Sequence, residues 1–295
     1  MSQAETAAPA PAPAPYGPRS RTALGVLALF RSELSITFRR LRTLALLAIL
    51  AALPVLIGVV VKVETGSAQG GGGPAFIAQV TQNGLFLVFT ALAVTLPVFL
   101  PLAVGVVAGD SVAGEASSGT LRYLLVAPAG RTRLLVAKFC ASLVFCVAAT
   151  LTVALAALAT GAALFPLGRV TLLSGDSVSF GEALLRAALI AAVVAASLAG
   201  LVAIGLFVST LTGSGIAAMA ATVGLVITVQ ILDGIPQLHT IQPWLFPHYW
   251  LSFADLLRQP MYLHDVVRNL GLQGLYVAVF GTAAWARFTG RDITA

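Results

Sequence analysis

Charged side chains are scarce in this chain. Asp, Glu, Lys and Arg make up 9% of its 295 residues, whereas 58% of the residues are hydrophobic. A soluble domain carries about 25% charged residues, so these charges are too few to cover a surface that faces water. The long hydrophobic segments are continuous and do not alternate with polar residues, which disfavours a β-barrel. The composition therefore predicts an all-α membrane protein surrounded by the lipid bilayer.

Cysteine is also rare. The two cysteines, Cys140 and Cys146, lie in one apolar run. Six helical residues rise about 9 Å, a separation too long for a disulfide bond. We expect two free thiols, which carry no information about the redox compartment.

Catalytic and nucleotide-binding motifs are missing. The sequence has no phosphate-binding loop of the form G-x-x-x-x-G-K-[ST], so we expect no ATP binding and no cofactor in this chain. It also lacks H-E-x-x-H and G-x-S-x-G. Its three histidines are widely spaced, which favours interfacial residues over metal ligands: His239, His248 and His264. The net charge of +6 comes from cations at the ends of apolar runs, so no nucleic-acid partner is expected.

The chain divides into three parts. Residues 1–18 are rich in Pro and Ala and should form an extended, disordered tail. Residues 19–42 predict a basic amphipathic helix at the membrane interface, because apolar residues recur every three or four positions: Leu24, Leu27, Phe30, Leu34, Phe38 and Leu41. Residues 43–295 are expected to form the transmembrane domain.

Six charge-free apolar segments predict six transmembrane helices, since a helix needs about 20 residues to cross the bilayer. They are Leu44–Val61, Leu85–Ala108, Phe139–Phe165, Ala187–Val208, Ile216–Leu232 and Asn269–Ala286. Pro54, Pro97 and Pro101 interrupt the first two, and neighbouring groups must satisfy the carbonyls that they free. No ionisable residue falls inside these segments, which argues against an ion-coupled carrier.

The distribution of Lys and Arg predicts the orientation. With six spans, both termini share a side with the loops after spans two and four, and this side holds twelve cations: Arg19, Arg21, Arg31, Arg39, Arg40, Arg42, Arg122, Arg131, Arg133, Lys138, Arg287 and Arg291. The other side holds five: Lys62, Arg169, Arg186, Arg258 and Arg268. The excess predicts cytoplasmic termini. On the outer side, the aromatic segment 233–268 predicts short helices at the interface or dipping into it.

The polar stretch 109–138 separates spans two and three and is itself patterned. We expect Gly109 and Asp110 to end span two and Ser111–Glu115 to begin a short helix, with acids near its positive end. The following elbow should expose Glu115 and Arg122 to the cytosol, while Arg131 anchors the chain to lipid headgroups. A plain amphipathic connector is the simpler interpretation of the same pattern.

The segment GEASSGTLRYLLVAPAGRTRLLVAKF resembles the loop between the second and third spans of ABC-2 type exporter permeases. The matching positions are Asp110, Glu115, Gly119, Thr120, Leu121, Leu124, Leu125, Pro128, Arg131 and Lys138. The six-span plan, the basic lead-in helix and the apolar outer segment are also similar to that family.

This resemblance implies a role for the stretch. In such permeases the elbow is a coupling helix seated in a separate ATP-binding subunit, which holds ATP and Mg, and two permease copies pair with two ATPases in the plasma membrane. The ATPase-coupling residues would be Asp110, Glu115, Gly119, Thr120, Leu121, Arg122 and Arg131. The substrate path stays unknown, although the charge-free spans slightly favour a hydrophobic or amphipathic substrate.

Two other functions stay open at this point. One is a membrane-embedded lipid-modifying enzyme, with candidates in the outer segment: Asp233, His239, His248, Asp255 and His264. The other is a membrane anchor or assembly factor that transports nothing. Neither has a recognisable catalytic spacing or motif in its support.

Overall fold

The computed structural model describes residues 23–67, 75–117, 130–172 and 174–290. The predicted tail 1–18 lies outside them. The N-terminal half contains α1 (Ala23–Arg39), α2 (Leu41–Ser67), α3 (Ala75–Gln82), α4 (Phe86–Thr95), α5 (Phe99–Ser117) and α7 (Arg131–Leu164). Two antiparallel strands of two residues each, β1 (Val170–Thr171) and β2 (Ser177–Val178), form a hairpin. It leads to α8 (Phe180–Ser197), α9 (Ala199–Leu211) and α10 (Gly215–Asp233). The short 3-10 helices η1 (Pro236–Leu238), η2 (Gln242–Trp244) and η3 (Trp250–Leu257) precede α11 (His264–Thr289).

Five helical stretches of the described chain are long and apolar enough to cross a membrane. They are Leu41–Glu64, Phe99–Ser117, Arg131–Leu164, Phe180–Leu211 and Gly215–Asp233. An all-α membrane protein is therefore confirmed. The predicted sixth span, Asn269–Ala286, lies within α11, whose first half carries Asp265, Arg268, Asn269 and Gln273 and which is not among the five. The number of six spans stays a prediction.

The second predicted span is built from two helices. The regular α-helix is interrupted by a turn between Thr95 and Phe99, at Pro97, because proline cannot donate a backbone hydrogen bond. Pro54, in contrast, lies inside an unbroken α2. The expected end of span two at Gly109 and Asp110 is wrong, since α5 continues to Ser117.

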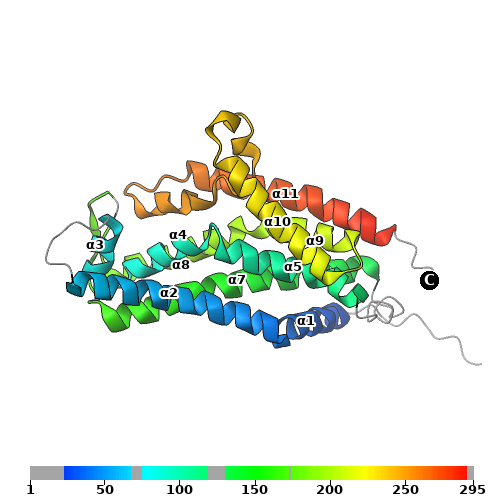
Figure 1. Ribbon diagram of the computed structural model, residues 1–295, viewed down its shortest axis with the longest axis horizontal. Coiled ribbons are helices and arrows are strands. Elements are labelled where there is room, and N and C mark those ends of the chain that lie inside the picture. The colour runs from blue at the N-terminus through cyan, green and yellow to red at the C-terminus, as the bar shows by residue number, and fades with distance from the viewer. Residues whose placement is uncertain (1–22, 68–74, 118–129, 173, 291–295) are drawn as a thin grey trace, which may run out of the picture.

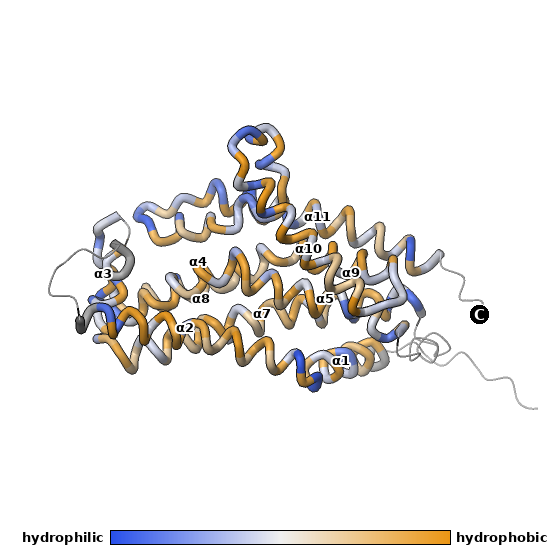
Figure 2. Tube along the Cα trace, in the orientation of Figure 1, coloured by the Kyte–Doolittle hydropathy of each residue, from blue (hydrophilic) through white to orange (hydrophobic). Residues whose placement is uncertain are grey.

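Most of the helices run along the long axis of an elongated bundle, whereas α10 crosses it obliquely (Figure 1). α2 packs against α7, α5 against both α9 and α10, and α11 against α9. α1 and the last turns of α11 lie at the same end, where α5 ends and α7 begins. Hydrophobic residues cover the middle of the bundle, and hydrophilic ones gather near its ends and on the loop after α10 (Figure 2). This distribution is the one that a bilayer requires.

Two glycines allow the start of α4 to touch α7. The backbones at Gly84 and Gly161 lie so close that a Cβ atom on either would overlap the other's backbone. Gly84 also donates its N–H to the carbonyl of Pro166, at 3.0 Å. Small residues permit such close helix contacts inside a membrane protein.

Replacing Gly161 by alanine should therefore destabilise the bundle by about 1–3 kcal/mol, the usual cost of overpacking. Gly274→Ala is the matched control, because a Cβ atom there meets nothing within 4 Å. Thermal unfolding of the two variants in the same detergent measures the difference. Equal melting temperatures would contradict the close crossing.

The segment after α10 contains short helices, as predicted, all of the 3-10 type. Phe246, Trp250 and Phe253 are buried, and the buried Arg186 of α8 holds the end of η3 by donating to the carbonyls of Leu256 and Arg258, at 3.0 and 3.2 Å. The segment is thus part of the fold and not a free loop. In Figure 1 its η1–η2 part stands out from the side of the bundle.

Candidate functional site

Six charged side chains meet where α1, α2, α5 and α7 come together. We call them the charge cluster: Glu33, Arg40, Arg42, Asp110, Glu115 and Lys138. Three are acids and three are cations, so the formal charge of the cluster is zero. The opposite charges compensate one another, and this compensation is what allows ionised side chains to be buried in a membrane protein.

Lys138 of α7 lies at the centre of one half of the cluster. Its Nζ atom is 2.9 Å from Glu33 Oε2 of α1 and 2.5 Å from Glu115 Oε1 of α5. The Lys138 side chain is 2% exposed, and those of Glu33 and Glu115 are 5% and 6% exposed. One ammonium group therefore joins three helices, and the two carboxylates depend on it for charge compensation.

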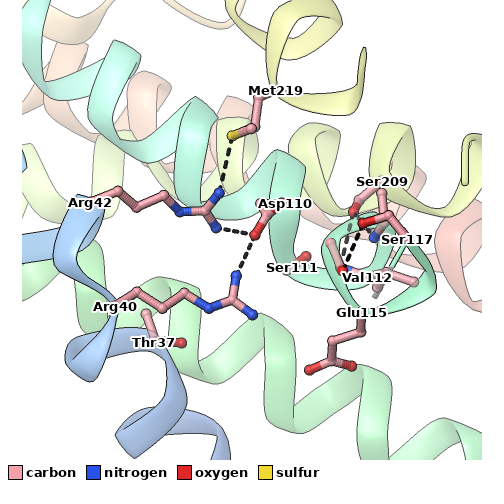
Figure 3. A network of polar contacts seen from close by, with 12 residues as sticks. Thr37, Arg40, Arg42, Asp110, Ser111, Val112, Glu115, Ser117, Ser209 and Met219 are labelled. Carbon is pink, nitrogen blue, oxygen red and sulfur yellow. Dashed lines mark hydrogen bonds and ion pairs between the residues drawn. The ribbon is translucent and has the colours of Figure 1, made fainter. Parts of the chain in front are cut away.

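Asp110 of α5 organises the other half (Figure 3). Its Oδ2 atom accepts hydrogen bonds from both Arg40 and Arg42, which lie where α1 turns into α2. Arg42 also reaches Met219 Sδ of α10, at 3.5 Å. The Asp110 side chain is 6% exposed, whereas the two arginines are about one-third exposed. The carboxylate is thus the buried member of the group, and the cations reach in from the surface.

Glycines make room for this carboxylate. A Cβ atom at Gly114 or at Gly215 would collide with the carboxylate of Asp110. Gly215 is the first residue of α10, which places the negative charge beside the positive end of that helix. The site is therefore shaped for aspartate at this position.

Ser209 of α9 provides a further link. Its Oγ atom accepts hydrogen bonds from the backbone N–H groups of Val112 and Ala113 in α5, at 3.0 and 2.9 Å. These donors lie in the same turns of α5 as Asp110 and Glu115, and Ser209 is fully buried. α5 is consequently held around its last two turns by side chains from the junction of α1 and α2, from α2, from α7 and from α9.

Ser209→Ala should lower the free energy of unfolding by about 1–3 kcal/mol, because it removes the two buried hydrogen bonds that join α9 to α5. Thr228→Ala on α10 serves as the control, since its exposed hydroxyl bonds only to the backbone of its own helix. Denaturant or thermal unfolding measures both. A Ser209 variant as stable as the control would show that the contact contributes nothing.

The structure brings together two of the seven residues predicted for coupling and places a third elsewhere. Asp110 and Glu115 lie in the charge cluster, and Arg131 begins α7 and donates to the carbonyl of Thr289 at the end of α11, at 2.9 Å. Gly119, Thr120, Leu121 and Arg122 lie outside the described residues. The expected exposure of Glu115 is wrong, because its pairing with Lys138 allows it to be buried, at 5% exposed.

Sequence reasoning also placed every ionisable residue outside the spans. In the structure Asp110, Glu115, Lys138 and Arg186 are buried inside helices that qualify as spans. It gave no role to Glu33 or Ser209 in a site, and it counted Arg40 and Arg42 only among the cations that predict the orientation. One signal for these partners was present in the sequence. Glu33 is an acid between the apolar residues Phe30 and Leu34, in a segment whose other charged residues are basic.

The outer candidates do not form a common site. His248 Nδ1 lies 2.6 Å from Asp233 Oδ1, and Asp255 is 3.5 Å from Arg258. Among the described residues no group of three His, Cys, Asp or Glu side chains could hold a metal ion. Both Cys140 and Cys146 are free, as predicted.

A bundle of apolar helices with a neutralised charge cluster at one end defines an integral membrane protein whose helices are coupled by buried ion pairs. Residues 27–259 match the family described as ABC-2 family transporter protein. The chain belongs to this family, as the resemblance implied, and is thus a membrane component of a transporter. No curated protein matches the chain.

Proposed function

We propose that the chain is the permease subunit of an ATP-driven exporter in the plasma membrane, with both termini in the cytoplasm. A separate ATP-binding subunit holds ATP and Mg and hydrolyses the nucleotide. A second permease copy completes the transport path, and α11 provides the sixth span. In this arrangement α1 lies at the membrane interface.

The charge cluster is the observation that carries the proposal. The stretch 109–138 begins in the last turns of α5, which contain Glu115, and ends in the first turns of α7, which contain Lys138. These two side chains bind each other, and Lys138 also binds Glu33. A force on the stretch therefore acts on α5 and α7 together and reaches α1 and α2 through Glu33 and Asp110. These contacts support the proposal that a partner bound at the stretch is coupled to the spans.

A reversal of charge at Arg122 tests the proposal. We expect Arg122→Glu to abolish stimulation of the partner ATPase and ATP-dependent transport, because it changes the proposed docking segment. Arg287→Glu is the control, since this exposed residue lies at the same end of the bundle, in the last turn of α11. Co-purification and ATPase activity in proteoliposomes measure the two variants. Undiminished assembly and transport with Arg122→Glu would refute the coupling role.

A further inference from the structure

A groove lies between the segment after α10 and the first half of α11. It has a volume of about 380 Å³ and is lined by Pro243, Trp244, Tyr249, Arg268, Gly271, Leu272 and Leu275. Most of the lining is apolar, and no carboxylate takes part. Its single charge is the guanidinium of Arg268.

The polar side chains that line this groove can all donate a hydrogen bond. Within the described part of the chain, no carboxylate lies within ion-pair distance of Arg268, although Asp265 is one turn away on the same helix. The described residues also offer no hydrogen-bond partner to the Tyr249 hydroxyl or to Trp244 Nε1. The Trp244 side of the groove is nevertheless fixed, because Tyr276 donates to the Trp244 carbonyl at 2.9 Å. The groove therefore offers one cation and two neutral hydrogen-bond donors, and its Trp244 side is fixed in position.

The surface around the groove is apolar and exposed. Leu275, Leu270 and Val267 on α11 are 48%, 40% and 64% exposed, and Trp244 is 65% exposed. Trp, Tyr and Arg are side chains that favour the boundary between headgroups and acyl chains. A ligand for this groove must combine an anionic group for the donors with an apolar chain for Leu272 and Leu275.

We propose that the groove binds an acidic phospholipid. Its phosphate pairs with Arg268 and accepts hydrogen bonds from Tyr249 and Trp244, and one acyl chain lies along Leu272 and Leu275. The phosphate compensates the charge of Arg268, which has no carboxylate partner among the described residues. The bound lipid also links the segment after α10 to α11. This inference goes beyond the proposed transport function and does not depend on it.

Lipid binding to the purified full-length chain in a neutral detergent tests the inference. Phosphatidylglycerol should raise the melting temperature in a saturable manner, whereas phosphatidylcholine and glycerol phosphate should not. Arg268→Gln should weaken the apparent affinity for phosphatidylglycerol at least tenfold. Arg258→Gln is the matched control, because it removes the same charge from the same segment but its partner is Asp255, at 3.5 Å.

Three results would overturn the inference. They are equal stabilisation by phosphatidylcholine, unchanged affinity in Arg268→Gln, and an equal loss in Arg258→Gln. If Arg268→Gln instead dissociates a dimer in size-exclusion chromatography without changing lipid affinity, the groove is covered by a second copy and the lipid assignment is wrong. None of these measurements uses the ATPase, so failure here leaves the transport proposal standing.

Discussion

Replacing Lys138 by methionine is expected to destabilise the protein by about 3–5 kcal/mol, the usual cost of breaking a buried ion pair from one side. Methionine fills much of the same space, so the loss comes mainly from charge. Glu33 and Glu115 would be left as two buried carboxylates with their shared partner removed. A loss of this size is a large fraction of the stability of a typical domain. We expect a low yield of folded protein and a strongly reduced melting temperature in detergent.

A rescue experiment separates charge from packing. The triple variant Lys138→Met, Glu33→Gln, Glu115→Gln has no buried charge at this position and should recover much of the stability lost in the single variant. Glu33→Gln and Glu115→Gln alone set the baseline. If the triple variant is as unstable as Lys138→Met, the ammonium group acts through its packing and not through the two carboxylates.

Replacing Asp110 by asparagine should cost less, about 1–3 kcal/mol. Arg40 and Arg42 are about one-third exposed, so solvent can partly replace the lost carboxylate. We expect a larger effect on transport than on folding, because the junction of α1 and α2 would lose its charged link to α5. Thermal unfolding and ATP-dependent transport, measured on the same preparation, give the two effects.

Asp110→Glu is the informative comparison. Glutamate keeps the charge but is one methylene longer, and Gly114 and Gly215 already touch the carboxylate of Asp110. We therefore expect overpacking to destabilise this variant by about 1–3 kcal/mol.

Asp176→Asn is a suitable control for Asp110→Asn, since Asp176 is an exposed residue of the β1–β2 hairpin region. Full activity of Asp110→Asn would mean that the link to Arg40 and Arg42 is not needed for coupling.

Much of the fold follows directly from hydrophobic patterning. A segment such as Leu44–Val61 has no alternative to a lipid-exposed helix, and Pro97 marks the break between α4 and α5. The extension of α5 past Asp110 could not be predicted in this way. Charge at Asp110 and Glu115 predicts the end of a span unless their partners are known, and these partners lie 23 to 70 residues away in the chain.

The candidate site was predictable only where a motif reached it. The resemblance identified Asp110, Glu115 and Lys138 as members of the motif. It did not predict that Glu115 and Lys138 bind each other. Ser209 carries no local signal, and Glu33 stands out only as an acid in a basic segment, because a single polar residue in an apolar helix has many possible partners. Their roles depend on which helices are neighbours, and this is information that a single sequence lacks.

The long separations within the charge cluster also bear on how the protein is made. Glu33 and Lys138 are 105 positions apart, so the chain is synthesised well past α5 before this ion pair can form. Asp110 follows Arg40 and Arg42 by 70 and 68 positions, so until α5 is made these arginines are uncompensated cations beside the first span, the kind of signal that fixes orientation during membrane insertion. The same arginines thus serve twice in time: first as free charges that retain the N-terminal end on its own side, and later as neutralised partners of Asp110.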